Sequence, residues 1–210
     1  MELITSLNIR KSEYLSKDRF TSYHHQLRLV FNLGSKINNI LEIGIFNSIF
    51  TELLKSNGYN VTTADIDSNL HPDLLLDLSS DFQLPSDKYD VIVLFQVLEH
   101  IPYDNFELAL QKLAIATKKH IVISIPYHSL FLGSQIRFSY QARSRYLFFH
   151  IPRFWSSKPL CEQHYWEMGL KEYPKKRILN SITKAGLWVK QEFTDPTHPY
   201  HCFFVLEKVN

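Results

Sequence analysis

Two short segments that are apolar on both faces constrain the fold of this chain most. Residues 90–95 read Asp-Val-Ile-Val-Leu-Phe, and residues 120–125 read His-Ile-Val-Ile-Ser-Ile. A strand with one face in water alternates apolar and polar residues, whereas a strand covered by helices on both sides is apolar almost throughout. The two segments therefore predict a sheet that is buried between two layers of helices.

Strand-like and helix-like segments alternate along most of the chain. Helices are expected before Gly34, from Ile49 to Gly58, from Tyr103 to Lys118 and from Pro174 to Gly186, with the glycines near their ends. The expected strands are 40–44, 60–64, 74–76, 90–95, 120–125, 187–193 and 202–208. This order predicts a Rossmann-like α/β fold with a seven-stranded, mostly parallel sheet, a C-terminal antiparallel hairpin and helices on both faces.

Composition excludes several classes of protein. The 210 residues carry a net charge of +2, which is too small to indicate nucleic-acid binding. The two cysteines, Cys161 and Cys202, are far apart and offer neither a disulfide framework nor zinc-ligand spacing. Residues 1–10 contain no apolar run long enough for a signal peptide or a membrane span. The expected location is therefore the cytoplasm.

Polar residues and glycine follow the first four expected strands. Gly44 would let a ligand approach the backbone closely, since it has no side chain. Asp65, about twenty residues further on, suits a carboxylate that binds ribose hydroxyls. Asp77 follows the third strand and could accept a hydrogen bond from an adenine amino group, and Gln96 follows the fourth. Because ligands of open α/β sheets bind beyond the carboxyl ends of the strands, these residues predict a nucleoside site.

The chain resembles the class I S-adenosylmethionine-dependent methyltransferases from about Tyr23 to Lys208. The matching motifs are Leu-Glu-Ile-Gly at 41–44, Val-Thr-Thr-Ala-Asp-Ile-Asp at 61–67, Lys-Tyr-Asp-Val-Ile-Val at 88–93 and Phe-Gln-Val-Leu-Glu-His at 95–100. The last motif and the terminal hairpin are not explained by the alternative, a nicotinamide-dependent dehydrogenase. The resemblance implies S-adenosylmethionine as the cofactor and S-adenosylhomocysteine as the product.

The same resemblance implies the residues that contact the cofactor. Glu42 and Gly44 would lie near its methionine part, and Asp65 would bind its ribose. Asp77 and Leu78 would flank the adenine, and Gln96 would lie beneath the sulfonium. The full implied set is Tyr23, Glu42, Gly44, Asn47, Asp65, Ile66, Asp77, Leu78 and Gln96.

One loop departs from the family pattern. The family has Gly-x-Gly-x-Gly where this chain has Gly44-Ile45-Phe46-Asn47-Ser48. A phenylalanine does not readily adopt a positive φ and would crowd the cofactor unless its ring turns away. Two functions therefore stay open: a methyltransferase acting on a small-molecule acceptor, and a catalytically degenerate methyltransferase-like binding or scaffold protein.

Three residues are candidates for catalysis. His100 directly follows the fourth strand and suits a general base, and Glu99 precedes it. The alternative, that His100 only bonds a backbone carbonyl and caps the next helix region, stays open. His164 begins a His-Tyr-Trp-Glu segment similar to one found in a bacterial methyltransferase subgroup; Tyr165 and Trp166 within it could instead be core aromatics. No metal site is expected, since no histidine pair has compact ligand spacing.

Residues 127–173 interrupt the alternation of strands and helices. We expect one methyltransferase domain over residues 1–210, with 127–173 as an insert or lid bordering the acceptor site. Within it, residues 137–155 mix arginine with phenylalanine, tyrosine and tryptophan. Three interpretations stay open: a lid that buries aromatics, a site for an anionic acceptor, and a contact with a membrane surface or lipid-linked acceptor. Nucleic acid is not an expected partner, and the oligomeric state is left undetermined.

Overall fold

The computed structural model describes residues 16–139, 141 and 144–209, and its centre is a seven-stranded sheet. The strand order is β3-β2-β1-β4-β5-β9-β8, with parallel pairing from β3 to β5 and antiparallel pairing of β9 with both β5 and β8. The predicted Rossmann-like fold is thus confirmed. The strands are β1 (Asn39–Ile43), β2 (Asn60–Asp65), β3 (Leu74–Leu75), β4 (Tyr89–Phe95), β5 (Thr117–Pro126), β8 (Leu187–Asp195) and β9 (His198–Lys208).

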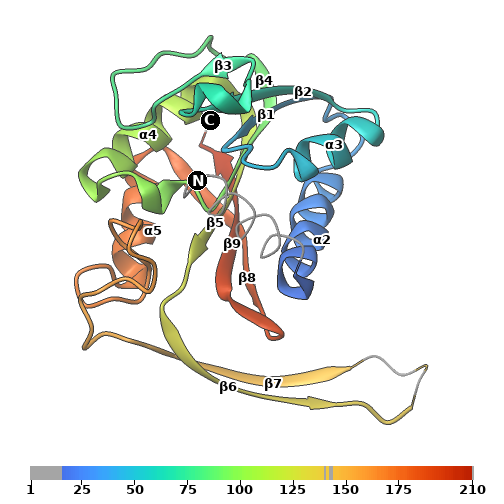
Figure 1. The fold of residues 1–210 in the computed structure, drawn as a ribbon, viewed down its shortest axis with the longest axis vertical. Coiled ribbons are helices and arrows are strands. Elements are labelled where there is room, and N and C mark those ends of the chain that lie inside the picture. The colour runs from blue at the N-terminus through green and yellow to red at the C-terminus, as the bar shows by residue number, and fades with distance from the viewer. Residues whose placement is uncertain (1–15, 140, 142–143, 210) are drawn as a thin grey trace, which may run out of the picture.

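Helices cover both faces of this sheet (Figure 1). Side chains of β4 point alternately into two apolar clusters. Val91 and Val93 pack with the helices of one face, whereas Ile92 and Leu94 pack with those of the other, which explains why this strand lacks a polar face. The first face carries α2 (Lys17–Asn32) and α3 (Ile49–Ser56), and the second carries α4 (Tyr103–Ala116) and α5 (Lys175–Lys184). Two single turns, η1 (Ser68–Leu70) and η2 (Leu98–His100), follow β2 and β4.

The terminal hairpin is longer than the sequence predicted. Residues expected in a loop between 193 and 202 instead extend both strands, with Thr194 paired opposite Cys202. The turn contains only Pro196 and Thr197 between the strands. The Asp195 carboxylate accepts hydrogen bonds from the backbone and side chain of Thr197, so a local side-chain turn closes the hairpin.

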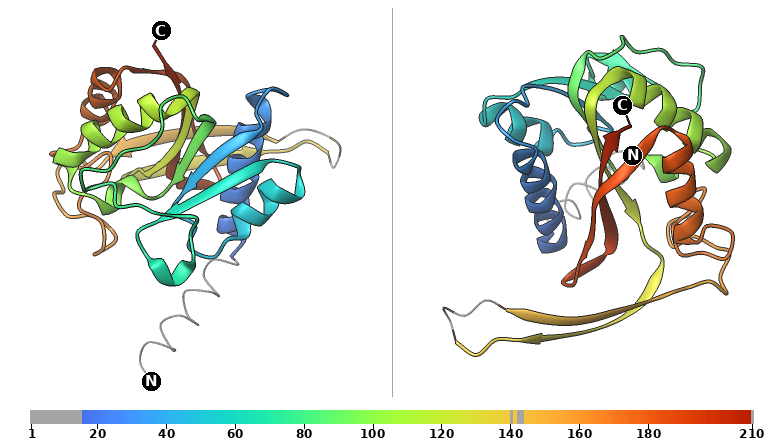
Figure 2. Two further views of the ribbon diagram at one scale, coloured as in Figure 1. Left: turned by 90° about the horizontal axis from the view of Figure 1, so that it is seen from above. Right: turned by 180° about the vertical axis from the view of Figure 1, so that it is seen from behind.

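A separate two-stranded ribbon lies within the expected insert. It consists of β6 (Ser129–Ile136) and β7 (Arg145–Pro152), which pair only with each other. The ribbon projects away from the central sheet in Figure 1 and in the right view of Figure 2. The sequence did not predict these strands, because their apolar residues do not alternate cleanly with polar ones.

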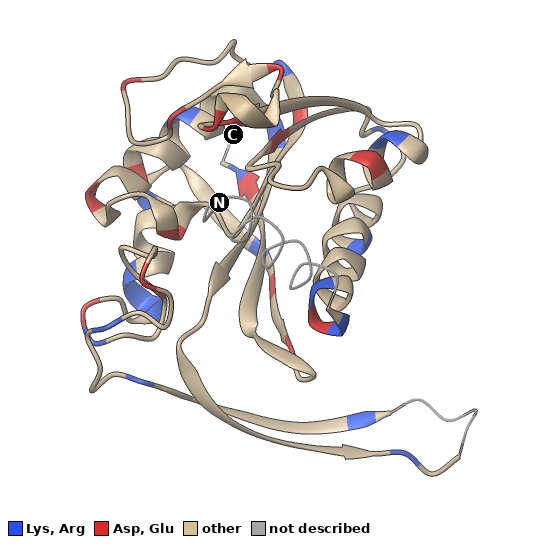
Figure 3. Cartoon of the chain, in the orientation of Figure 1, with Lys and Arg blue, Asp and Glu red and all other residues tan. Residues whose placement is uncertain are grey.

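Charged residues of both signs are interspersed over the helices around the sheet (Figure 3). Among the described residues, no helix has the length and apolar character needed to cross a membrane.

Candidate functional site

A small cavity lies at the carboxyl ends of β1, β2 and β3. Its volume is about 100 Å³. The parallel strands end at the same edge of the sheet, so residues distant in sequence meet there. The predicted cofactor residues that line it are Gly44, Asp65, Ile66, Asp77 and Leu78, together with the catalytic candidate His100.

Both aspartates of the cavity are held by local hydrogen bonds. The Asp65 carboxylate accepts from the backbone N–H groups of Ile45 at 2.9 Å and Asp67 at 3.0 Å. Asp65 thereby joins the end of β2 to the loop after β1. The Asp77 carboxylate accepts from the backbone and hydroxyl of Ser79, at 2.8 and 2.6 Å. These bonds fix each carboxylate, and each keeps lone pairs for a further donor.

The loop after β1 has positive φ angles at three positions, although only the first of them, Gly44, is a glycine. Its φ angles are +85° at Gly44, +34° at Phe46 and +57° at Ser48. The expectation that phenylalanine would avoid a positive φ is therefore wrong here. Hydrogen bonds explain it, since Gly44 N–H donates to β2, Ile45 N–H donates to Asp65, and Ser48 N–H donates to the Ile45 carbonyl.

Asn47 and Tyr23 contact each other beside this loop. The Asn47 amide donates to the Tyr23 hydroxyl at 3.2 Å, and its oxygen accepts from the backbone of Ile49 at 3.2 Å. Ser48 is the N-cap residue of α3 but makes no side-chain capping bond, so Asn47, one residue earlier, supplies the side-chain acceptor at the start of the helix. Although α2 and α3 are separate helices, they bring these two predicted cofactor residues together.

Glu42 and Gln96 do not line the small cavity. Glu42 is buried in β1 and accepts a hydrogen bond from the Thr51 hydroxyl at 2.7 Å. Burial raises the pKa of Glu42 to about 7. The Gln96 side chain donates to Ser124 at 3.1 Å and accepts a hydrogen bond from Arg19 of α2. Gln96 thus connects the end of β4 to the N-terminal helix.

The three catalytic candidates, Glu99, His100 and His164, lie close together. Their ligand atoms are all within 4.8 Å of one another. His100 Nδ1 lies 3.2 Å from the Gln163 carbonyl oxygen, which requires the proton on Nδ1 and leaves Nε2 as an acceptor in the neutral ring. Burial, reinforced by His164, lowers the pKa of His100. The backbone contact that the sequence left as an alternative is present, and the same ring lines the cavity.

Glu167 is the centre of a hydrogen-bond network beside these candidates. Its Oε1 accepts from His164 Nδ1 at 2.7 Å and from the Tyr200 hydroxyl at 2.9 Å. The backbone N–H of Leu160 donates to the same oxygen at 3.1 Å, and His128 Nδ1 lies 3.2 Å from Oε2. Burial alone would raise the pKa of Glu167, but these hydrogen bonds lower it below its usual value. The carboxylate is therefore charged at neutral pH.

Glu99 is the opposite case. Its side chain is fully buried, and neither carboxyl oxygen has a hydrogen-bond partner among the described residues. The nearest base is His164, whose Nε2 lies 4.0 Å from Oε1. Burial raises the pKa of Glu99 to about 8, so the group is largely protonated at neutral pH.

The same three candidates include the atoms that a divalent cation prefers, two imidazole nitrogens and a carboxylate oxygen. The sequence lacked this signal because the ligands come from two segments more than sixty residues apart. The expectation that the chain holds no metal stays a prediction.

Sequence reasoning missed His128 and misplaced one aromatic residue. His128 follows β5 and is buried against Glu167, so the strand-end rule that found Gly44 could have found it. Trp166 is a core residue, fully buried with its indole N–H donating to the Ile101 carbonyl at 3.1 Å. Tyr165 is 62% exposed, so the interpretation of both aromatics as core residues is wrong for Tyr165.

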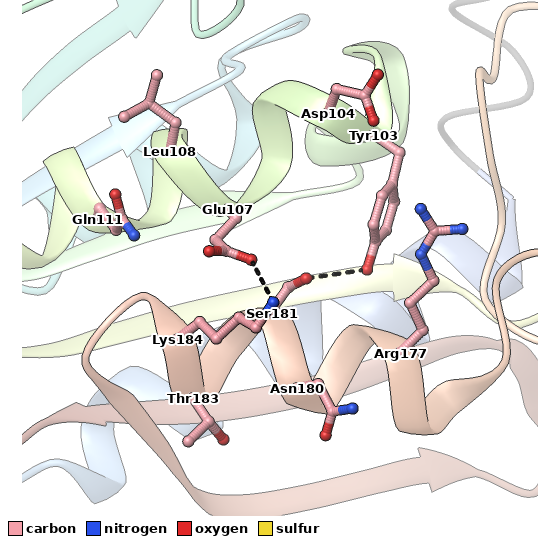
Figure 4. A pocket seen from close by; sticks show the side chains of 10 residues that line it. All are labelled: Tyr103, Asp104, Glu107, Leu108, Gln111, Arg177, Asn180, Ser181, Thr183 and Lys184. Atoms are coloured by element: carbon pink, nitrogen blue, oxygen red, sulfur yellow. Dashed lines mark hydrogen bonds and ion pairs between the residues drawn. The ribbon is translucent and has the colours of Figure 1, made fainter.

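A larger hollow of about 710 Å³ lies between α4 and α5 (Figure 4). No predicted site residue lines it. Its polar groups bond with one another: the Tyr103 and Ser181 hydroxyls are 3.2 Å apart, and Lys184 lies 3.9 Å from Glu107. The candidate site therefore remains the edge where β1, β2 and β3 end.

Comparisons with known proteins identify the class. Residues 15–172 match the family model described as a methyltransferase domain, so the chain belongs to that family. The predicted membership of the class I S-adenosylmethionine-dependent methyltransferases is confirmed. No curated protein matches the chain.

Solved structures share the fold at low sequence identity. The chain is similar to magnesium protoporphyrin IX methyltransferase from Synechocystis (TM-score 0.66, 13% identity, covering 97% of this chain and 94% of that one). It is also similar to 1,6-didemethyltoxoflavin-N1-methyltransferase from Burkholderia thailandensis (0.63, 12%, 100% and 86%). A third similar structure is the N-methyltransferase NodS from Bradyrhizobium japonicum (0.58, 14%, 93% and 90%). All three structures contain S-adenosylhomocysteine.

Proposed function

We propose that this protein transfers the methyl group of S-adenosylmethionine to a small-molecule acceptor. The observation that carries the proposal is the cavity in which Gly44, Asp65 and Asp77 meet at the ends of three parallel strands. The similar structures support it, since they contain S-adenosylhomocysteine and two of these enzymes are named for a small molecule, 1,6-didemethyltoxoflavin or magnesium protoporphyrin IX. The cytoplasm is the proposed location.

The residues of the cavity fit this cofactor. A Cβ at Gly44 would lie 2.3 Å from Val97 Cγ2, so only glycine leaves the loop close to the end of β4. The Asp65 carboxylate would accept hydrogen bonds from the ribose hydroxyls, and Asp77 with Leu78 would contact the adenine. Ile66 is 66% exposed beside the cavity, which gives an apolar surface for the base. When bound, the cofactor supplies a methyl group activated by a positively charged sulfur.

We propose that His164 is the general base, positioned by Glu167. The Glu167 carboxylate holds the proton on His164 Nδ1, so Nε2 carries the lone pair that would take a proton from an acceptor hydroxyl or amine. His100 would bind the acceptor at the cavity, and protonated Glu99 would be a neutral neighbour of His164, whose Nε2 lies 4.0 Å away. The insert at 127–173 supplies His164 and Glu167 and would border the acceptor.

Titration calorimetry with S-adenosylmethionine and S-adenosylhomocysteine tests cofactor binding. We expect Asp65→Ala to weaken binding by about 1.5–3 kcal/mol, roughly 10- to 150-fold in Kd, because charge-assisted hydrogen bonds are lost. Asp67→Ala is the matched control, since it removes the same charge from a carboxylate that only caps a turn at Asn69. Equal losses in the two variants, or no binding by the native protein at millimolar cofactor, would refute the proposal.

One observation favours a second function, a degenerate methyltransferase-like binding or scaffold protein. Phe46 and Ser48 replace two glycines at positions where φ is positive. The variant Phe46→Gly/Ser48→Gly separates the two functions. A large gain in cofactor affinity would indicate a site that has decayed, whereas unchanged affinity would indicate a loop adapted to its present side chains.

A further inference from the structure

The β6–β7 ribbon has an apolar face that stays exposed in the described part of the chain. In an antiparallel pair, directly opposed residues share a face, and so do residues two apart along each strand. Leu130 is opposite Ile151, Leu132 is opposite Phe149, and Ile136 is opposite Arg145 at the outer end. The apolar side chains of this face are 41–73% exposed; they are Leu130, Leu132, Ile136, Leu147, Phe149 and Ile151.

The other face of the ribbon differs. It carries Ser129, Gly133 and Gln135 together with aromatic residues, of which Phe131 is 55% and Tyr146 41% exposed. His150 lies between Phe148 and Tyr127, with ring centroids at 4.4 and 4.8 Å. The second face thus mixes polar and aromatic residues and contacts the body of the protein through His150 and Tyr127, whereas the first face is mostly aliphatic and exposed.

The charge of this region is of one sign. No aspartate or glutamate occurs between Glu107 and Glu162 in the sequence. The ribbon and the loop after it contain basic residues, and Figure 3 shows basic but no acidic positions along the described part of the ribbon. The basic residues that the structure describes there are Arg137, Arg145, Arg153 and Lys158. A second copy of this surface would offer no carboxylates to these cations, whereas anionic lipid headgroups would.

Exposed aromatic residues continue from the ribbon into the following loop. Phe154 is 64% exposed and Trp155 is 54% exposed. Tryptophan beside arginine is typical of segments at the membrane–water interface, where the ring meets the acyl boundary and the cation meets the phosphates.

We propose that the apolar face of the β6–β7 ribbon docks on the surface of an anionic phospholipid membrane. Eight residues in each strand give a ribbon about 26 Å long, which can lie in the headgroup region without spanning the bilayer. His128, next to the start of β6, contacts Glu167. If the proposed function holds, docking would bring the acceptor side of the site to the membrane, where a lipid-linked acceptor resides.

Vesicle flotation of the full chain tests docking without cofactor or acceptor, so its outcome is independent of methyl transfer. We expect the native protein to float with phosphatidylglycerol-containing vesicles, not with pure phosphatidylcholine, and to be released by high salt. Leu132→Glu and Phe149→Glu should each reduce binding at least about tenfold, because they place a charge on the apolar face. Arg145→Gln should reduce it about fivefold.

The matched control is Ile115→Glu, which places the same charge on an apolar residue of α4 that is 55% exposed. It should float like the native protein, and thermal unfolding followed by circular dichroism should show that all variants fold. Equal flotation with both lipids, or equal loss in the control, would overturn the proposal. A native dimer in light scattering that becomes monomeric in Leu132→Glu, with no flotation, would instead assign the ribbon to self-association.

Discussion

Gly44 offers the sharpest test of how the loop after β1 is built. Gly44 and Gly58 have nearly equal φ angles, +85° and +86°, so alanine at either position meets the same backbone strain of about 1–2 kcal/mol. In both variants alanine regains roughly 0.4–1 kcal/mol by restricting the unfolded chain. The surroundings differ. A Cβ at Gly58 would have nothing within 4 Å, whereas one at Gly44 would lie 2.3 Å from Val97 Cγ2.

Because Val97 is β-branched, it cannot rotate away easily, so Gly44→Ala should cost about 1–3 kcal/mol more than Gly58→Ala. Urea unfolding of both variants measures this difference. In a double-mutant cycle, Gly44→Ala should lose this extra cost when Val97 is already alanine. The two substitutions should therefore show a favourable coupling energy of the same size. Equal destabilisation at the two glycines, or a coupling energy near zero, would refute the close packing of Val97 on Gly44.

Three further predictions concern titration and metal. Burial raises the pKa of Glu99 from 4.5 to about 8. The contribution of Glu99 to the free energy of unfolding is therefore fully present below pH 4.5 and is lost as the pH rises through 8. Glu99→Gln should therefore flatten that decline in unfolding free energy. The hydrogen bond from His25 lowers the pKa of Asp195, so its stabilisation exists above about pH 3.8 and is lost as pH falls further. Asp195→Asn should unfold at a lower denaturant concentration than the native protein at pH 7, with the difference shrinking in acid. Methyl transfer should survive dialysis against a chelator, and a loss restored by Mg²⁺ or Zn²⁺ would make Glu99, His100 and His164 metal ligands.

The meeting of Gly44, Asp65 and Asp77 at one edge of the sheet could be predicted because it depends on where strands end. The runs that end at Gly44, Asp65 and Asp77 are bounded by local signals, and parallel pairing places those ends together. No side-chain contact had to be known. The fold therefore follows from periodicity, and Gly44, Asp65 and Asp77 follow from the strand ends, whereas Ile66 and Leu78 came only from the family resemblance.

The loop conformation could not be predicted in the same way. Residue type argues against positive φ at Phe46 and Ser48, yet both adopt it. Hydrogen bonds to β2 and to Asp65 override that local preference. The hydrogen-bond network of Glu167 could not be predicted either, because it joins His128 and Tyr200, which are each more than thirty residues away along the chain. The sequence spacing of Glu167, His128 and Tyr200 gives no indication that the three side chains are in contact.

The proposed acid–base chemistry rests on two carboxyl groups whose environments separate their pKa values. Glu167 is charged because four donors surround one of its oxygens, whereas Glu99 is neutral because it is buried without any. His164 lies between them, with Nδ1 on the charged group and Nε2 4.0 Å from the neutral one. When the environments of two carboxyl groups separate their pKa values in this way, the group with the raised pKa can hold a proton and the group with the lowered pKa can orient a base. In the proposed reaction, Glu167 therefore orients the imidazole, and a proton taken by Nε2 stays beside a carboxyl group that does not compete for it.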